Sequence, residues 1–187
     1  LARSALKISL LRMNAVERMA ALARSMQRLI TEGKEELVLN YNPSVPGLKG
    51  APFEEVPARE EVLRRLQGLR RLEILRGTTL LGPHRDELSI QINDVDARAF
   101  GSQGQQRTGV LALKLAELEF MREETGENPI LLLDDVMSEL DYSRRKFLTE
   151  AIRNKVQVFV TTTGLHSFQE VQLADSRLFT ICNGTIS

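Results

Sequence analysis

The hydrophobic pattern at the start of the chain has the period of an α-helix. Apolar residues recur every three to four positions over residues 2–32, which predicts one long helix with Leu6 and Leu10 on its buried stripe. Gly33 offers a stop for this helix. Residues 36–41 alternate between apolar and polar side chains, as in a half-buried strand. This part of the chain therefore predicts a helix followed by a strand.

A proline-rich stretch and a highly charged segment come next. Residues 42–57 contain four prolines and predict a loop. Residues 58–76 predict a helix whose arginines, among them Arg64 and Arg71, have carboxylate neighbours such as Glu61. A solvated helix face and a DNA-binding stripe both fit these arginines. We favour the solvated face, because leucines along the same helix supply an ordinary packing edge.

After residue 77 the pattern changes to alternating strands and helices. The predicted elements are a hairpin of residues 88–93 and 97–100 that turns near Asn93-Asp94, a helix over 103–124, a strand over 130–133, a helix over 142–153, a strand over 156–160, and two weaker strands over 177–181 and 184–186. A strand, a helix and a second apolar strand predict a parallel sheet that is buried on both faces. We expect an α/β fold with a boundary near residue 80, between a helical arm (1–80) and a second domain (81–187).

Composition and charge narrow the class of protein only a little. The chain has 187 residues, is 42% hydrophobic, and has 25 basic and 25 acidic side chains, so its net charge favours neither nucleic acid nor a membrane surface. Its single cysteine, Cys182, excludes an internal disulfide and suits a reducing, cytoplasmic compartment. No apolar run approaches the ~20 residues of a membrane span. The chain opens at Leu1 inside a helical pattern, so we expect it to be a piece of a larger cytoplasmic protein.

Residues 130–135 are the sharpest candidate for chemistry. Four apolar residues predict a buried strand, and Asp134 stands at its C-terminal tip, where ligands bind in open parallel sheets. A carboxylate there can hold the Mg²⁺ that bridges nucleotide phosphates. Asp135 can then orient or deprotonate an attacking water. Aspartates also follow strands because they suit turns and helix N-caps, so the pair alone leaves both interpretations open.

Two further segments accompany this aspartate pair. Residues 101–107 (GSQGQQR) stand where a strand gives way to a helix. Unpaired backbone N–H groups and the helix dipole suit a phosphate at such a place, although Ser102 could equally serve as a plain N-cap. Residues 138–141 (SELD) begin three positions after Asp135.

Taken together, these three segments resemble the linked motifs of the ABC ATPases. Residues 101–105 resemble the signature motif, 130–135 the Walker B strand, and 138–141 the D-loop, and their order and spacing agree with that family. Three linked motifs are far more specific than any one of them. The resemblance implies an ABC-type ATPase lobe with a signature helix, a Walker B strand and a partly parallel sheet, joined to a helical arm.

Within that superfamily the chain is most similar to the SMC-like RecF family of bacterial DNA-repair proteins. Residues 100–108 (FGSQGQQRT), the Asp-Asp form of Walker B and residues 81–86 (LGPHRD) carry this similarity. It covers essentially the whole chain, strongly from residue 77 onward and loosely before it. Another SMC-like or transporter ATPase is the nearest alternative, and the QQRT continuation and the GPHRD turn weigh against it.

The resemblance implies roles for individual residues of the signature and the D-loop. Ser102, Gln103, Gly104 and Gln105 would contact the γ-phosphate of ATP held by the opposite subunit, and Asp141 would belong to the D-loop that reports across the dimer.

Asp134 would be the Mg²⁺-linked aspartate, and Asp135 would be the catalytic residue, in the position where transporters have glutamate. The switch histidine of many ABC proteins is replaced by threonines 161–163, of which Thr163 is the expected switch; His166 is either a substitute or a simple loop residue.

One motif of the superfamily is missing. No G-x-x-x-x-G-K-[ST] string, the loop that cradles nucleotide phosphates, occurs in the chain. We therefore expect half of an ATP site and no activity from the chain alone. In the GPHRD turn, His84 and Arg85 either contact phosphate or DNA or serve only local structure, with Asp86 pairing with Arg85 or capping nearby backbone.

The function implied by the resemblance is ATP-dependent DNA repair. The full-length protein would bind ATP and Mg²⁺, form a head-to-tail homodimer, hydrolyse ATP slowly, bind double-stranded and gapped DNA, and help load recombinase at single-stranded gaps. RecR-like and RecO-like mediators would be its partners. The alternative from another class is a non-hydrolysing interaction module of the same fold, and ATPase measurements on the full-length protein separate the two.

Overall fold

The computed structural model describes residues 1–45, 48, 55–153, 155–165, 168 and 176–186. It divides into two compact units, Leu1–Phe120 and Met121–Ser187. The architecture is α/β with one parallel pair of strands, in agreement with the expected fold class.

The first unit contains the predicted arm and the signature helix. Its elements are α1 (Ala2–Ile30), β1 (Leu37–Asn42), α2 (Glu55–Arg76), the 3₁₀ turn η1 (Pro83–Arg85), β2 (Glu87–Ile92), β3 (Val95–Asp96) and α3 (Gln103–Thr125), the last of which continues into the second unit. The three helices and the first strand predicted for this region are confirmed within a few residues.

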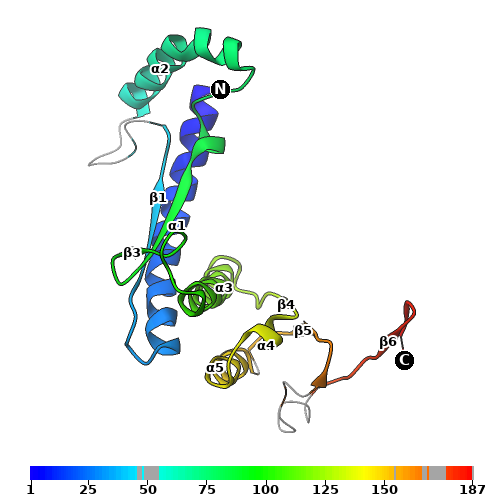
Figure 1. The fold of residues 1–187 in the computed structure, drawn as a ribbon. Coiled ribbons are helices and arrows are strands. Elements are labelled where there is room, and N and C mark those ends of the chain that lie inside the picture. Colours follow the sequence, from blue (N-terminus) through cyan, green and yellow to red (C-terminus); the bar gives the residue numbers. More distant parts are fainter. Residues whose placement is uncertain (46–47, 49–54, 154, 166–167, 169–175, 187) are drawn as a thin grey trace. The chain divides into compact units, whose positions relative to one another are not determined.

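A three-stranded antiparallel sheet, β1-β2-β3, runs beside α1 (Figure 1). Asn93 and Asp94 form the turn between β2 and β3, both with positive φ (50° and 64°), as a tight two-residue hairpin requires. This turn fixes the register as Ile92↔Val95, so the second strand is Val95–Asp96. The predicted strand over 97–100 is wrong: these residues form a turn in which the Ala99 N–H donates to the Asp96 carboxylate.

Two buried regions stabilise this unit. Near the start of α1, buried apolar side chains from α1, the loop after β1, α2 and the segment before η1 form one cluster: Ala2, Leu6, Val45, Leu48, Ala58, Val62 and Leu81. On the sheet, Leu37 and Ile92 are paired across β1 and β2 and are almost completely buried. A Cβ added at Gly109 of α3 would lie 3.4 Å from Ile92 Cδ1 and 3.6 Å from Leu37 Cδ1, so α3 packs closely on this sheet.

The second unit contains the Walker B strand. Its elements after α3 are β4 (Leu131–Asp134), α4 (Val136–Glu139), α5 (Tyr142–Ile152), β5 (Val158–Thr161), β6 (Ile181–Cys182) and β7 (Thr185–Ile186). Strands β4 and β5 are parallel, as predicted, and pair Leu131 with Val158 through Asp134 with Thr161. β6 and β7 pair antiparallel across Asn183-Gly184, both with positive φ, and Arg177–Thr180, expected in a strand, has no regular structure.

Only one face of the β4–β5 pair is covered by the described residues. Leu131 and Leu133 are buried, whereas Leu132 is 73% and Phe159 is 51% exposed. Because paired residues of neighbouring strands point to the same face, Leu132 and Phe159 form one open apolar surface. The prediction that both faces are buried is therefore wrong for this structure, since nothing in its described part covers the second face.

The boundary predicted near residue 80 lies inside the first unit. The pairing of β1 with β2 joins residues on either side of it. Among the described residues, no helix has the length and apolar content needed to cross a membrane.

Candidate functional site

The signature segment begins with a close approach of backbone to backbone. A Cβ added at Gly101 would lie 2.5 Å from the carbonyl oxygen of Ala97, closer than such atoms approach. The same turn brings the Gly101 N–H to that oxygen, at 3.2 Å, and the side-chain amide of Gln106 donates to it as well, at 3.0 Å. Glycine is therefore required where the chain passes from β3 into α3.

Ser102 and Gln105 form a reciprocal cap at the start of α3. The Gln105 N–H donates to Ser102 Oγ at 3.2 Å, and the Ser102 N–H donates to Gln105 Oε1 at 3.0 Å. This is the capping-box arrangement, with glutamine three residues after the serine. The N-cap interpretation of Ser102 is thus confirmed as a structural role.

Capping leaves some hydrogen-bond donors at the start of α3 available. The N–H groups of Gln103 and Gly104 lie in the first helical turn and have no acceptor within the helix. Ser102 Oγ accepts a bond from Gln105, so its own proton stays available for a second partner. Ser102 and Gln103 are exposed. Two backbone donors, one hydroxyl proton and the positive end of the helix dipole together suit a phosphate oxygen.

The Walker B aspartates stand at the carboxyl end of the parallel strands. Asp134 ends β4 and is paired with Thr161, which ends β5. The Thr161 hydroxyl donates to Asp134 Oδ1. Asp134 is exposed, and its other oxygen, Oδ2, accepts no hydrogen bond from the described part of the chain. The carboxylate therefore lies at the strand tip with one oxygen held and one open.

Asp135 follows in an unusual backbone conformation. Its φ of 50° and ψ of 16° place it in the left-handed region, which aspartate tolerates better than most residues. Its N–H is shared between the carbonyl oxygen and the hydroxyl of Thr161, at 3.2 and 3.1 Å. Asp135 precedes α4 but its side chain makes no cap hydrogen bond there, and it is exposed.

The oxygen ligands at this strand tip suit a hard cation. No group of three or more metal-ligating side chains gathers among the described residues. Mg²⁺ does not require one, because it is usually held by one or two carboxylates together with waters and substrate phosphates. The exposed Asp134 carboxylate, with Oδ2 open, fits that pattern.

The other residues predicted for this site follow the aspartate pair in the sequence, and each has its own surroundings in the structure. Asp141 is the N-cap of α5: its Oδ1 accepts from the Arg144 N–H at 2.9 Å, and its carboxylate forms an ion pair with the Arg144 guanidinium. Thr163 is exposed and lies two residues beyond the end of β5. His166 lies outside the described residues. The D-loop role of Asp141 and the switch role of Thr163 stay predictions.

His84 and Arg85 are exposed but tied to the preceding turn. Arg85 donates from Nε and Nη2 to the carbonyl oxygen of Thr79, at 3.0 and 2.8 Å, and from Nη2 to the Thr78 hydroxyl at 3.0 Å. The His84 ring nitrogen Nε2 lies 2.7 Å from the Thr79 hydroxyl. Both side chains thus brace residues 78–79, and a contact with phosphate or DNA stays a prediction.

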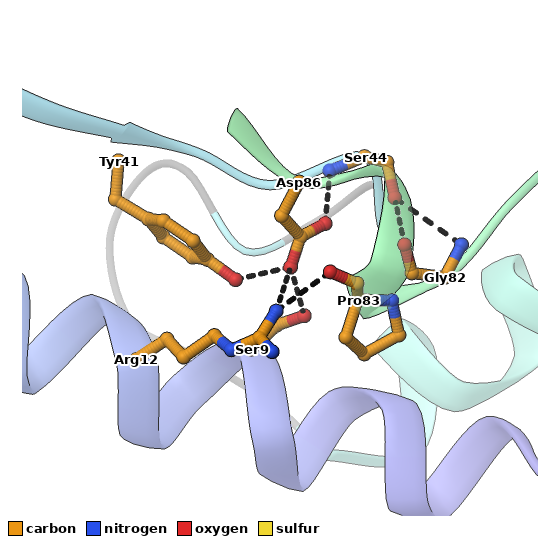
Figure 2. A network of polar contacts seen from close by, with 7 residues as sticks. All are labelled: Ser9, Arg12, Tyr41, Ser44, Gly82, Pro83 and Asp86. Carbon is orange, nitrogen blue, oxygen red and sulfur yellow. Dashed lines mark hydrogen bonds and ion pairs between the residues drawn. The ribbon is translucent and has the colours of Figure 1, made fainter. Parts of the chain in front are cut away.

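Asp86 joins three segments that are distant in sequence (Figure 2). Its carboxylate accepts from the Ser9 hydroxyl of α1 at 3.0 Å, from the Tyr41 hydroxyl of β1, and from the Ser44 N–H at 2.8 Å. Arg12 lies 3.8 Å away and donates to the Pro83 carbonyl. The expectation that Asp86 pairs with Arg85 is wrong, because its carboxylate points toward α1 and the end of β1.

The surroundings of Asp86 favour its charged form. Its side chain is 1% exposed. Burial by itself would raise the pKa of Asp86, but the hydrogen bonds from Tyr41 and Ser44 outweigh it and hold the pKa below the usual range. Burial and the neighbouring Asp86 carboxylate raise the pKa of Tyr41. The pair is therefore a phenol that donates to a carboxylate at neutral pH.

Two of these residues were missed as contributors by the sequence. The run of threonines 161–163 gives no sign of which one ends the strand. The sequence around Asp86 indicates only a local role in a turn. Its partners lie 77, 45 and 42 positions away, so no local pattern could have indicated them.

The arginines of α2 agree in part with the interpretation of this helix as a solvated face. Arg64 and Arg65 both form ion pairs with Glu61. These guanidinium groups thus have carboxylate partners on their own helix, as in a solvated face.

The chain matches known proteins along nearly its whole length. No protein-family model matches the chain. The protein named DNA replication and repair protein RecF is 44% identical to it over 186 residues in Macrococcus caseolyticus, 46% over 189 residues in Natranaerobius thermophilus and 40% over 187 residues in Ligilactobacillus salivarius. These matches cover 95–100% of the chain but 47–49% of the relatives, so the chain spans about half their length.

Two solved structures share the fold. One is described as the recombination mediator protein RecF-ATPrS in the RecFOR pathway; it has a TM-score of 0.83 and 37% identity, and the match covers the whole chain and 47% of that protein. The second, described as RecF-ATP in the same pathway, has a TM-score of 0.80 and 35% identity. The chain is therefore homologous to RecF along its whole length and has the fold of that part of RecF.

Proposed function

We propose, from this homology to RecF and from the arrangement of its aspartates, that the chain forms part of an ATP-dependent DNA-binding repair protein. The full-length protein would bind ATP with Mg²⁺, form a homodimer on ATP, hydrolyse ATP slowly and help load recombinase at single-stranded gaps. Double-stranded and gapped DNA, and RecR-like and RecO-like mediators, would be its partners in the cytoplasm. The solved relatives described with ATP and ATPrS support the choice of nucleotide.

The observation that carries this proposal is the strand tip formed by Asp134, Asp135 and Thr161. Asp134 ends β4 and Asp135 follows it, at the carboxyl edge of a parallel pair of strands, where nucleotides bind in α/β proteins. Asp134 has one oxygen held by Thr161 and one open, and Asp135 is fixed in a left-handed conformation beside it. The Asp134 carboxylate and the Asp135 backbone are thus both held by Thr161, and the two residues would serve different tasks.

Each residue would have one role in hydrolysis. Asp134 would hold the Mg²⁺ that neutralises phosphate charge when nucleotide is bound. Asp135 would accept a hydrogen bond from the attacking water and orient it. Aspartate is one methylene shorter than the glutamate of transporters and would reach the water less well, which supports slow turnover.

The signature turn would serve the nucleotide of a second subunit. The Ser102 hydroxyl and the N–H groups of Gln103 and Gly104 would donate to the γ-phosphate, and Gln105 would hold Ser102 in place through their shared cap. A site completed by a partner's signature turn would form only in a dimer. ATP-dependent dimerisation and hydrolysis would then depend on the same contacts.

Separate substitutions of the two aspartates test the proposal in the full-length protein. Asp134→Asn should weaken Mg²⁺-dependent nucleotide binding and with it hydrolysis. Asp135→Asn should keep nucleotide and metal but reduce turnover by ~10²–10⁴-fold, as expected for loss of a general base. The matched control is Asp94→Asn. Asp94 is an exposed aspartate in the β2–β3 turn, where asparagine is well tolerated, so this substitution should change neither nucleotide binding nor turnover.

The measurements are single-turnover hydrolysis and equilibrium binding of a fluorescent ATP analogue. Equal losses of nucleotide binding in both variants would overturn the division of roles. A wild-type protein that binds ATP but never hydrolyses it would instead identify a non-hydrolysing module of the same fold.

A further inference from the structure

The Thr161 hydroxyl makes two hydrogen bonds at once, one to each of the Walker B residues. It donates its proton to Asp134 Oδ1 and accepts the N–H of Asp135 at 3.1 Å. A hydroxyl has one donor and two acceptor positions, so both bonds form together without conflict. Thr161 therefore links the end of β5 to both aspartates through hydrogen bonds.

The two bonds constrain different degrees of freedom. The first restricts the rotation of the Asp134 carboxylate, because Oδ1 accepts the Thr161 hydroxyl while Oδ2 accepts no hydrogen bond from the described residues. The second, with the parallel bond to the Thr161 carbonyl oxygen at 3.2 Å, holds the Asp135 backbone in its left-handed conformation. That conformation is costly for a residue other than glycine and needs support from its surroundings.

Threonine is well suited to this position. It ends strand β5, where its β-branched side chain has few alternative rotamers, so the hydroxyl is held near one direction. Serine would keep the hydroxyl but lose part of that restriction. Valine has almost the same shape and can make neither bond. Thr161 is exposed, so its replacement by valine should disturb the fold little.

We propose that Thr161 is a positioning residue that sets the Asp134 carboxylate for Mg²⁺ and the Asp135 backbone for catalysis. This inference rests on the proposed function, since it assigns Thr161 a role in the same site. It differs from the switch expected at Thr163, because Thr161 acts through the two aspartates and need not touch nucleotide. Residues that orient metal ligands typically change metal affinity by ~10–100-fold when they are replaced.

Thr161→Val and Thr161→Ser in the full-length protein test this inference, with Thr125→Val as the matched control. Thr125 has the same kind of bonds, donating to the Met121 carbonyl at 2.8 Å and accepting the Glu127 N–H at 3.2 Å, but both are local to the end of α3. The first readout is Mn²⁺ binding in the presence of a slowly hydrolysed ATP analogue, followed by electron paramagnetic resonance. The second is the Mg²⁺ dependence of turnover, and the third is the thermal unfolding midpoint.

Thr161→Val should weaken Mn²⁺ binding by about tenfold or more, raise the Mg²⁺ concentration needed for turnover, and lower the rate at saturating Mg²⁺. Thr161→Ser should retain most of the wild-type metal affinity and turnover, and Thr125→Val should match wild type in metal binding. Unchanged Mn²⁺ affinity in a folded Thr161→Val protein would overturn the inference. A loss of Mn²⁺ affinity in Thr161→Ser equal to that in Thr161→Val would also overturn it. Absence of Mg²⁺-dependent hydrolysis in the wild-type protein would contradict the proposed function instead, while Mn²⁺ binding would still test Thr161.

Discussion

Ser102 and Gln105 cap each other at the start of α3, with the Gln105 N–H 3.2 Å from Ser102 Oγ and the Ser102 N–H 3.0 Å from Gln105 Oε1. The cap uses the lone pairs of the Ser102 oxygen, and its proton stays available for the phosphate contact that the proposed function assigns to this serine. Substitutions that keep the cap but change the charge can separate the two roles.

Ser102→Asp should abolish ATP-dependent dimerisation without destabilising the protein. Aspartate is as good an N-cap as serine, but its negative charge would face the γ-phosphate of the other subunit. Ser102→Arg should also prevent dimerisation, with some loss of the cap. Both variants should still bind ATP, because the proposed function places this serine at the nucleotide of the other subunit and not at its own. Size-exclusion chromatography with ATP is the measurement, and a normal dimer peak for either variant would refute the contact across the dimer.

Gly101→Ala and Gly68→Ala should change stability in opposite directions. An alanine Cβ at Gly101 would lie 2.5 Å from the Ala97 carbonyl oxygen, so the turn would have to shift, at a cost of about 1–3 kcal/mol. Gly68 lies inside the exposed α2 helix with nothing within 4 Å, so alanine there should stabilise by ~0.5–1 kcal/mol. Thermal unfolding of the full-length variants measures both. A neutral Gly101→Ala would mean that the signature turn is more adaptable than its geometry indicates.

Tyr41→Phe should destabilise the protein by about 1.5–3 kcal/mol at neutral pH, because the lost hydrogen bond goes to a charged group. The folded-state pKa of Asp86 is lowered, so its contribution to stability is complete above the ordinary aspartate pKa of about 3.9. It should be lost progressively as the pH falls through the folded-state value. The pKa of Tyr41 is raised, so its contribution is present below about pH 10 and declines above it.

Chemical denaturation of wild type, Tyr41→Phe and Asp86→Asn between pH 7 and pH 3 checks these signs. The stability difference between wild type and Asp86→Asn should shrink as the pH falls. A difference that is constant with pH would mean that the Asp86 charge has no part in the network.

Residues 1–187 alone should neither bind nor hydrolyse ATP appreciably. The loop that cradles the β- and γ-phosphates and supplies the phosphate-binding lysine is absent from the sequence. Isothermal titration calorimetry with ATP and Mg²⁺ is the test, beside the full-length protein as the positive control. Micromolar affinity of the isolated chain would show that its own residues supply a complete nucleotide site.

The sequence predicted most helices and strands to within a few residues, and the places where it failed share one physical cause. The turn at Asn93-Asp94 was recognised from its residues, but the position of the second strand depends on which residues pair across it. The left-handed conformations at the turn made Val95 the first paired residue and left 97–100 to form another turn. Strand pairing depends on two segments, so the hydrophobic period of one segment cannot predict it.

What the sequence determined by itself is therefore what short-range physics decides. Helical period fixes α1 and α3, the serine-to-glutamine spacing fixes the cap at Ser102, and an apolar run ending in aspartates fixes the Walker B strand. Tertiary structure alone decided the partners of Asp134 and Asp86. Thr161 is 27 positions from Asp134, and Ser9 is 77 positions from Asp86. These contacts form only when the folded chain brings its strands and helices together, so the burial and geometry that govern them do not exist in the sequence before folding.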